Sequence, residues 1–513
     1  MTTDALKLPK TIKELEAIIQ PYESRIEYLE QRLRVLEKML FASKSEKRRP
    51  DEDEGGQQLH LFNEAEQILE KAEEKPLSIP EHTRQKPKRK PLPPDLPRVD
   101  AVHDIEESEK ICQCGAQLCR IGEDVCEKLD IIPATVQVIR HIRPKYACKN
   151  CEGVESEGPT VIIAPPPPEI IPKGTATPGL LAHVAVSKYA DALPLYRQEK
   201  IFERYGIELN RSTMAGWMVK AAQACKPVMD LLYQKLRSGP LINVDETPVQ
   251  VLNEPGRANT TKSYMWVFRG GLPEKPVILY RYSATRSGEI PREVLQGYRG
   301  YCQTDAFSGY DGLEGTIEGI QLVGCFVHAR RNFIKVVDAR GKGGKSKTGS
   351  AEVALGYIGQ LYRIEKAARE AELSLCEMQR LRIERAEPVL EEFKAWLEKK
   401  KDQTPPQGLL GKAISYILSR WSKLVRYLEN AYITPDNNAA ENAIRPFVIG
   451  RKNWLFAGSP SGADAAATIY SLIETAKACG LDPYHYLRLI FEKIPYASTE
   501  TDYTALLPQS ITA

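Results

Sequence analysis

The sequence predicts a multidomain protein with an α/β core, preceded by helical and cysteine-rich segments and interrupted by a helical insertion. Three observations lead to this prediction. They are a heptad pattern of apolar residues near the start, a cluster of closely spaced cysteines, and a set of strand-like runs that begins at Leu241. A chain of 513 residues is long enough to hold several such domains.

Composition and charge narrow the class of protein. A hydrophobic content of 42% and a charged content of 27% are ordinary for a soluble globular protein. The net charge of +3 is close to neutral, so any affinity for nucleic acid requires local basic patches. No apolar run is long enough to span a bilayer, and Met1 leads into polar residues rather than a signal peptide. The 11 cysteines are an odd number and fit reduced thiols, so we expect a cytoplasmic protein with no membrane partner.

Residues 1–43 are predicted to form a coiled coil of the leucine-zipper type. Their apolar residues recur in alternating steps of four and three, as a and d positions do: Ile12, Leu15, Ile19, Tyr22, Ile26, Leu29, Leu33, Leu36 and Leu40. Pro21 interrupts the pattern, so its firm part begins at Tyr22. The alternative is a single amphipathic helix packed on its own domain. The regular spacing and polar flanks favour self-association into a homodimer or a larger oligomer.

Residues 44–100 are predicted to be a disordered linker that is rich in basic residues and proline. The stretches "RRPDEDEGGQQ" and "RQKPKRKPLPPDLP" lack the apolar surface needed to fold alone. Their basic residues are either a solvated tether or a means of gripping DNA phosphates by counterion release, whatever the base sequence.

Residues 101–160 are predicted to form a zinc-binding domain. Two close pairs of cysteines flank a β-rich stretch: Cys112, Cys114, Cys148 and Cys151. Four thiolates in two pairs are typical of a zinc ribbon, in which they close a tetrahedral site around structural Zn²⁺. Cys119 and Cys126 are alternative ligands, and buried free thiols are the alternative to a zinc site.

Residues 173–237 are predicted to be helical and follow a proline-rich spacer, "APPPPEIIP". Gly206 ends one amphipathic helix, and Asn210 or Ser212 begins the next. Two helices joined by a tight turn with glycine fit a DNA-binding helix-turn-helix. A plain structural hairpin fits the same pattern.

Residues 238–338 are predicted to form the first part of a catalytic core. Three strand-like runs, a short helix and two further strand-like runs follow one another: "LINVDETPVQV", "SYMWVFRG", "PVILYRY", "IPREVLQGY", "GYCQTDAFSGYDGL" and "IQLVGCFVHARRNF". This order is that of the ribonuclease-H-like fold, in which acids on the first and fourth strands lie side by side. Asp245 and Asp305 occupy those two places. For either aspartate taken alone, the alternative is an acid that is simply hydrated at the edge of the sheet.

Two carboxylates held close together repel unless a cation lies between them. Ligands that are all oxygen select hard ions such as Mg²⁺ or Mn²⁺, and two such ions with a third carboxylate can hydrolyse a phosphodiester. The expected third acid is Glu441, inside a helix that Asp436 or Asn437 begins, in the second part of the core over residues 433–479. Taken alone, Glu441 would be interpreted as an exposed acid on a helix, paired with Arg445.

Several cationic residues near these acids are candidate DNA contacts: His328, Arg330, Arg331, Arg445 and Lys452. For His328 the alternative is a structural histidine held near the core. Trp454 and Phe456 follow the same helix as Glu441 and suit stacking on unpaired bases.

Residues 339–432 are predicted to be a helical insertion between the second and third acids, and residues 480–513 a helical segment and tail. Basic residues recur along the insertion and suit DNA on one face or a merely solvated surface: Arg363, Lys366, Arg369, Arg380, Arg382 and Arg385.

Over nearly its whole length the chain resembles the large DDE transposase of insertion-sequence family sixty-six, the TnpC type. The resemblance rests on the two cysteine pairs and on long phrases: "LFASKSEKR", "NVDETPVQV", "TDAFSGYDGL", "GCFVHARRNF" and "DNNAAENAIRPFVIGRKNW". It implies that Asp245, Asp305 and Glu441 form a catalytic triad that binds Mg²⁺ and that the two cysteine pairs bind Zn²⁺. It also implies a bacterial, nucleoid-associated enzyme that acts on terminal repeats and target DNA with two small accessory proteins. The rival hypothesis is a non-catalytic, zinc-containing DNA-binding regulator derived from a transposase.

Overall fold

The structure is a computed structural model that describes residues 29, 135–147, 161–305, 307–340 and 349–511. The chain divides into two compact units, one of which is Glu74–Ala164. The predicted coiled coil lies outside the described residues except for Leu29, which is helical. The predicted linker and the four predicted zinc ligands also lie outside them.

The described part of the unit Glu74–Ala164 contains an antiparallel pair of short strands. Strand β1, Lys145–Ala147, pairs with β2, Val161–Ile163. The guanidinium group of Arg143 donates a hydrogen bond of 2.8 Å to the carbonyl of Ala164 and closes the open end of the pair. Strand β1 therefore ends immediately before Cys148, in the segment where the sequence predicts a β-rich ribbon.

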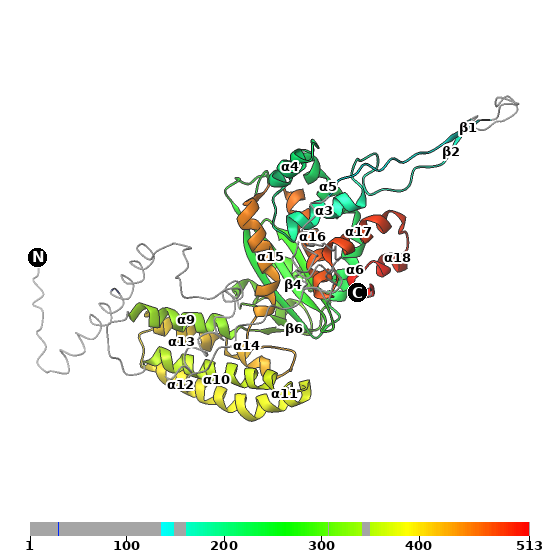
Figure 1. Cartoon of the computed structure of the whole chain (residues 1–513). Helices are drawn as coiled ribbons and strands as arrows, with labels where there is room; N and C mark the ends of the chain where they lie inside the picture. The colour runs from blue at the N-terminus through cyan, green and yellow to red at the C-terminus, as the bar shows by residue number, and fades with distance from the viewer. Residues whose placement is uncertain (1–28, 30–134, 148–160, 306, 341–348, 512–513) are drawn as a thin grey trace, which may run out of the picture. The chain divides into compact units, whose positions relative to one another are not determined.

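A mixed sheet forms the centre of the other unit (Figure 1). Its strands are β3 (Leu241–Val251), β4 (Lys262–Leu272), β5 (Lys275–Ser283), β6 (Gly300–Gln303), β7 (Ile320–Val323) and β8 (Phe456–Ala457). The strand order is β5-β4-β3-β6-β7, and β8 pairs with the far end of β3. Strands β3, β4 and β5 are antiparallel neighbours, whereas β6 and β7 run parallel to β3.

Helices before the sheet match the prediction of a helical region. They are α3 (Pro178–Tyr189), α4 (Leu195–Arg204), α5 (Arg211–Ala224) and α6 (Lys226–Leu236). Gly206 has a φ of 74° and turns the chain between α4 and α5, a conformation that glycine adopts without steric cost. Asn210 precedes α5, but its side chain makes no capping hydrogen bond.

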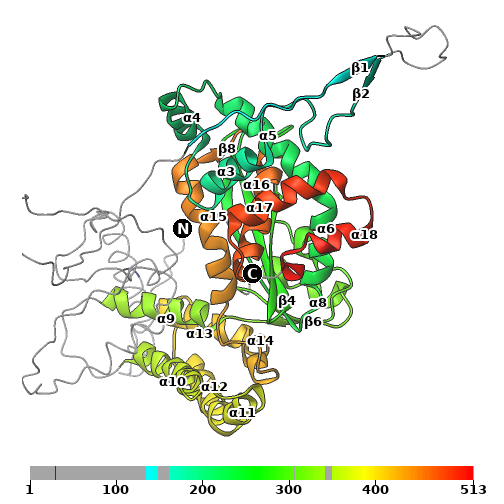
Figure 2. The ribbon, with the colours of Figure 1, turned by 45° about the vertical axis from the view of Figure 1, so that its right-hand side comes forward.

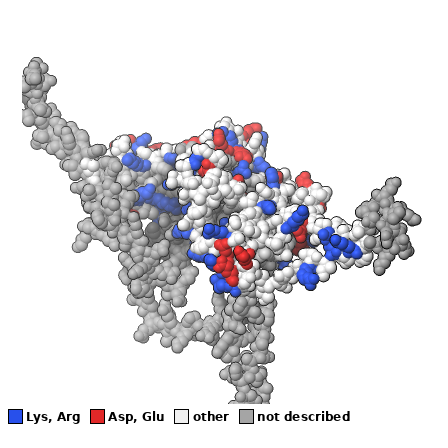
Figure 3. All heavy atoms as spheres, turned by 90° about the horizontal axis from the view of Figure 1, so that it is seen from above, with Lys and Arg blue, Asp and Glu red and all other residues white. Residues whose placement is uncertain are grey.

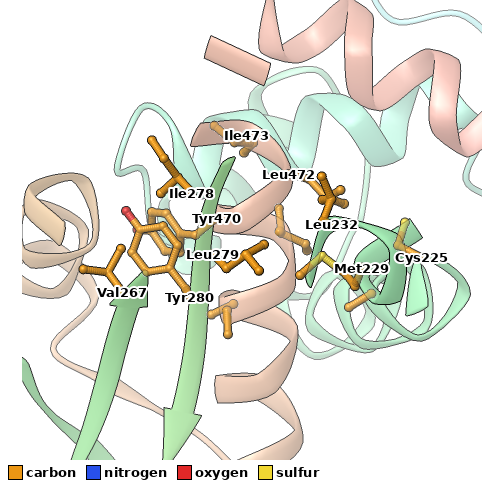
Figure 4. Packing of buried hydrophobic residues seen from close by; sticks show 14 of the residues in the cluster. Cys225, Met229, Leu232, Val267, Ile278, Leu279, Tyr280, Tyr470, Leu472 and Ile473 are labelled. Atoms are coloured by element: carbon orange, nitrogen blue, oxygen red, sulfur yellow. The ribbon is translucent and has the colours of Figure 1, made fainter. Parts of the chain in front are cut away.

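The edge of the sheet at β5 is covered by helix α16, Pro460–Ala478. The hydroxyl of Ser471 accepts a hydrogen bond of 2.7 Å from the backbone amide of Tyr280, and Thr475 binds both the amide and the carbonyl of Ile278. These hydroxyls satisfy backbone groups that an edge strand otherwise leaves open to other chains. Figure 4 shows apolar side chains of α6, β5 and α16 packed together behind this edge.

The predicted insertion is a separate bundle with its own apolar core. Its helices are α9 (Phe326–Arg340), α10 (Ser350–Glu370), α11 (Leu375–Leu381), α12 (Glu387–Asp402), α13 (Leu409–Ser419) and α14 (Trp421–Val425). They lie together at one end of the sheet in Figures 1 and 2, away from α3, α4 and α5. The chain then returns to the sheet through α15, Asn438–Trp454, and ends with α17 (Pro483–Lys493) and α18 (Glu500–Ala505).

Two expected strand boundaries are corrected. The run expected to be a strand from Ile320 to Phe333 is a strand only as far as Val323, and Phe326 begins helix α9. Its buried residues Phe326, Ala329, Phe333 and Val336 recur at helical spacing. The strand expected to end at Asp305 ends at Gln303. Among the described helices, none is long and apolar enough to cross a membrane.

Candidate active site

Asp245 and Asp305 are brought together by parallel pairing of β3 and β6. The register pairs Asn243 with Gln303, so each aspartate lies two residues beyond this pair. The amide of Asn243 donates a hydrogen bond of 2.9 Å to the side-chain carbonyl of Gln303. Both groups are buried, so this bond fixes the register at the sheet position next to the two acids.

Glu441 reaches the same place because the start of α15 is tied to β3. The side-chain amide of Asn437, only 1% exposed, donates to the carbonyl of Val244 at 2.8 Å. Its side-chain oxygen accepts from Asn243 at 3.1 Å, and its backbone amide donates to the sulfur of Cys325 at 3.3 Å. Glu441 lies in the first turn of α15, so these bonds hold its backbone beside the strand that carries Asp245.

The electrostatic environment of Asp245 combines burial with the charges of nearby acids. Burial raises the pKa of Asp245 well above its ordinary value, and the negative charges of Glu246, Glu441 and Asp305 raise it further. The backbone amide of Glu246 donates a hydrogen bond of 2.9 Å to Asp245 and opposes these effects. The ionised Asp245 carboxylate is therefore destabilised by the very groups that would share a cation with it.

Two arginines pair with the other carboxylates. Arg331 on α9 lies 3.4 Å from an oxygen of Glu441, and Arg286, after β5, lies 3.9 Å from an oxygen of Asp305. Arg286 also forms an ion pair with Glu246 and lies 3.7 Å from the centre of the Phe307 ring. These guanidinium groups supply the positive charge that four acids in one place require.

Glu246 is part of this network, and the sequence did not reveal its role. Its side chain is 1% exposed, and Tyr310 donates a hydrogen bond to it. Burial raises the pKa of Glu246, whereas Tyr310 and Arg286 lower it. Tyr310 lies in the phrase "TDAFSGYDGL" and Arg286 lies in no such phrase, but the link from Glu246 to each spans a long stretch of chain, so only the folded structure reveals these pairings.

The chemistry of the donor set suits a hard divalent cation, because Asp245, Asp305 and Glu441 offer only carboxylate oxygens. In the side-chain positions observed, however, no three His, Cys, Asp or Glu side chains of the described residues are arranged to hold a metal ion. In these positions Arg331 pairs with Glu441, and Arg286 lies near Asp305.

The residues predicted to contact DNA differ in their exposure to solvent. His328 is half-buried in the first turn of α9, with a ring nitrogen 3.3 Å from Arg331. Burial lowers its pKa, Arg331 lowers it further, and Asp305 acts in the opposite direction. Arg330 is only 5% exposed, and its assignment as a DNA contact stays a prediction. Burial raises the pKa of nearby Tyr362 on α10 well above its ordinary value, and the positive charge of Arg330 opposes this rise. Lys452 is exposed in the last turn of α15.

The raised pKa of Asp245 predicts a stability effect with a definite sign. Because the folded-state pKa is above the unfolded value, the ionised carboxylate destabilises the fold at neutral pH. This penalty declines as the pH falls below the raised pKa and is gone below the unfolded value. We expect Asp245→Asn to increase the free energy of unfolding without added metal by about 1 kcal/mol, raising the melting temperature by about 2 °C at pH 7.

The matched control for this prediction is Asp230→Asn. Asp230 is exposed and paired with Lys226 on α6, so we expect a change within about 0.5 kcal/mol. Thermal unfolding of both variants at pH 7 and at pH 4 measures the effect. A lower melting temperature for Asp245→Asn at pH 7, or an increase that grows as the pH is lowered, would contradict the account of the repulsion.

Comparison with known proteins gives four matches along the chain. Residues 173–465 match a family described as "Transposase IS66 family", and residues 109–152 match the "zinc-finger binding domain of transposase IS66". Residues 471–509 match the "IS66 C-terminal element", and residues 28–100 match "Transposase C of IS166 homeodomain".

Relatives that match most of the chain occur in Sinorhizobium fredii. The chain is 36% identical to the uncharacterized protein y4jD over 423 residues, which cover 80% of this chain and 79% of the relative. It is 32% identical to the uncharacterized protein y4qI over 512 residues, which cover 97% and 91% of the two chains. The similarity therefore extends well beyond the residues of the candidate active site.

Proposed function

The chain belongs to the IS66 family of transposases, and on that premise we propose that it cuts the ends of a bacterial insertion sequence and joins the freed 3′-hydroxyls to target DNA. A transposase with a zinc-finger domain acts on DNA, and the family implies a divalent metal and zinc as cofactors. The observation that carries the proposal is the convergence of Asp245, Asp305 and Glu441 from β3, β6 and α15.

We assign the core to the ribonuclease-H-like fold. The assignment is supported by the strand order β5-β4-β3-β6-β7, with β3 to β5 antiparallel and β6 and β7 parallel to β3. In such a sheet the first and fourth strands of the core are neighbours, so acids at their ends can share a metal ion. The helical bundle α9–α14 then enters between the second and third acids, as an insertion does.

In the proposed mechanism the three carboxylates would hold the divalent ions, without which they would repel the scissile phosphate. Bound Mg²⁺ or Mn²⁺ would lower the pKa of a water and stabilise the leaving oxygen. Attack by the water on phosphorus breaks the P–O3′ bond at the element end. The released 3′-hydroxyl later attacks a target phosphodiester, forms a new P–O bond and displaces the 3′-oxygen of the target strand, which leaves as a 3′-hydroxyl. The chain's own residues fix the geometry: Asn437 holds the helix of Glu441, and the Asn243–Gln303 pair holds the two aspartates.

We propose that Arg331 and Arg286 give up part of their pairing with the carboxylates when metal and DNA bind. A guanidinium group released from a carboxylate is well suited to a DNA phosphate, which it can bind with two hydrogen bonds. His328, Arg331, Arg445 and Lys452 are the proposed DNA contacts. Figure 3 shows Lys and Arg side chains interspersed with Asp and Glu on one face, so local groups of cations rather than net charge would bind the DNA.

The parts of the chain before the core have proposed roles in assembly. We propose that Cys112, Cys114, Cys148 and Cys151 bind structural zinc, and that the domain over residues 101–160 and the α4–α5 hairpin contact the element ends. The coiled coil over residues 1–43 would pair two protomers, because two ends must be processed in one complex. Assistance by two small accessory proteins and association with the bacterial nucleoid complete the proposal.

The pairing role predicts a specific defect. We expect deletion of residues 1–43 to give a monomer by light scattering that still nicks a single labelled end but no longer joins two ends in concert. A truncated chain that remains dimeric and joins both ends normally would remove the coiled coil from the account.

A strand-transfer assay tests the proposed function itself. The full chain is incubated with labelled element-end DNA, a target plasmid and Mg²⁺, and joined products are separated by electrophoresis. We expect joined product that depends on the divalent ion. The rival hypothesis, a zinc-containing DNA-binding regulator without catalysis, predicts binding of the end but neither nicked nor joined product in Mg²⁺ or Mn²⁺.

A further inference from the structure

A cavity of about 270 Å³ opens at the end of the core opposite the acids. We name it the α5–β8 slot, and six residues define it for the argument: Lys188, Gly216, Trp454, Phe456, Gly458 and Ala465. It lies where α5 faces the turn between α15 and α16. None of these residues belongs to the candidate active site.

The walls of the slot suit a flat, aromatic occupant. Gly216 on α5 and Gly458 after β8 carry no side chain, and a Cβ atom added at either one would meet no atom within 4 Å. Trp454 and Phe456 supply two aromatic groups, and Phe456 is 45% exposed. Open space between small residues, with aromatic rings beside it, is the arrangement in which a nucleobase stacks.

The rim of the slot is held in place by the sheet. Leu455 has a φ of 66°, which is rare for a residue with a side chain, and this conformation turns the chain sharply from α15 into β8. Strand β8 pairs with β3, and the side-chain amide of Asn253 donates a hydrogen bond of 3.1 Å to the carbonyl of Gly458. Strained backbone that is fixed from several sides is characteristic of ligand sites.

The charge of the slot is that of an anion site. Lys188 is the one charged residue among the described residues that line it, and no carboxylate lines it. Burial lowers the pKa of Lys188 to about 8, so its ammonium group is still mostly protonated at neutral pH. An apolar, aromatic slot with one cation complements a nucleotide, which joins a flat base to a phosphate.

The slot lies at a definite distance from the acids. Helix α15 carries Glu441 near its start and Trp454 at its end, which separates the two by about 20 Å. Along β3, Asp245 and Gln250, the partner of Phe456, are separated by about 17 Å. With a rise of about 3.4 Å per nucleotide, either path corresponds to about five or six nucleotides of DNA.

We propose that the α5–β8 slot binds a single nucleobase extruded from the element-end duplex, about five or six nucleotides from the scissile phosphate, with Lys188 on the adjoining phosphate. The proposal rests on the proposed function, because that function brings DNA across the acids. Binding in the slot adds a second point of attachment for the DNA, which fixes the position of the element end relative to the three acids.

The test measures the affinity of the full chain for element-end duplexes in which one nucleotide at a time lacks its partner base. A base without a partner leaves the helix at little cost. The duplex whose unpaired base lies at the slot is therefore expected to bind the protein more tightly. We expect an increase of about tenfold at one position, five or six nucleotides from the cleavage site, and little change elsewhere.

Two variants assign this increase to the slot. Gly216→Leu fills it from a helical position with free space around it, and we expect it to fold normally and to lose the position-specific increase. Lys188→Gln should reduce the slope of log affinity against log salt by about one. The matched control is Gly356→Leu, at an exposed helical position of α10 with equally free space, which should retain the increase.

The outcomes separate this proposal from the proposed function. An unmodified chain with no favoured position, or a Gly216→Leu chain that keeps the favoured position, would overturn the slot even if strand transfer proceeds. A favoured position that disappears in Gly216→Leu supports the slot even if no strand transfer occurs, in which case only the catalytic proposal fails. A chain that binds none of the duplexes would overturn both.

Discussion

Asp305→Asn is expected to leave the protein folded and to lower the rate of strand transfer by about 10³-fold or more. The loss follows from removing one of three carboxylates that hold the metal ions, whose stabilisation of the transition state is worth several kcal/mol. The asparagine oxygen can still accept the hydrogen bond of 2.8 Å that the backbone amide of Phe307 donates to Asp305, so the loop keeps its shape. The charge alone is removed.

The matched control is Asp311→Asn in the same loop. Asp311 is exposed and forms an ion pair with Lys423 on α14, away from Asp245 and Glu441. We expect strand transfer within about twofold of the unmodified chain, because a surface ion pair contributes little to stability. Equal product from Asp305→Asn and the unmodified chain, at equal occupancy of the DNA, would contradict the catalytic assignment.

Arg382→Leu is expected to reduce the free energy of unfolding by about 3–5 kcal/mol. The guanidinium group of Arg382 is 1% exposed and binds both oxygens of Glu365 at 2.8 and 2.9 Å. It also donates to the carbonyls of Tyr427 and Asn430 at 2.9 and 3.1 Å. Its removal leaves a buried carboxylate without its counter-charge and two carbonyls without a donor.

Denaturant unfolding measures this effect, with Arg385→Leu as the control. Arg385 lies three residues further along and is exposed, so we expect its change to stay within about 0.5 kcal/mol. The double variant Arg382→Leu with Glu365→Leu should recover part of the loss, since no unpaired buried charge remains. A loss below about 1 kcal/mol for Arg382→Leu would show that the pair does not anchor the insertion.

The sequence predicted the parts of the fold that follow from local patterns. Strands β3, β4 and β5 carry runs of β-branched and aromatic residues, and the helices from Pro178 to Leu236 carry clear turn and start signals. The order of strands then placed Asp245 and Asp305 side by side. The predicted coiled coil and zinc site stay predictions, because their residues lie outside those that the structure describes.

The remaining features depend on contacts between distant segments. The apolar residues at the start of the run from Ile320 to Phe333 do not distinguish a strand from a helix, so the strand predicted there is shorter and His328 lies on α9. The sequence places Arg382 among basic residues that face DNA or solvent, because nothing in it indicates that Glu365 meets Arg382 in the core of the insertion. Arg286 and Arg331 pair with acids that local sequence does not connect to them.

The most direct measurement is the location of Mn²⁺ by anomalous diffraction in crystals of the full chain with element-end DNA. The account predicts Mn²⁺ within about 2.0–2.6 Å of carboxylate oxygens from Asp245, Asp305 and Glu441, with Arg331 and Arg286 moved away from the acids. Mn²⁺ bound elsewhere, or bound by the aspartates while Glu441 stays paired with Arg331, would contradict the claim that these three acids form one metal site.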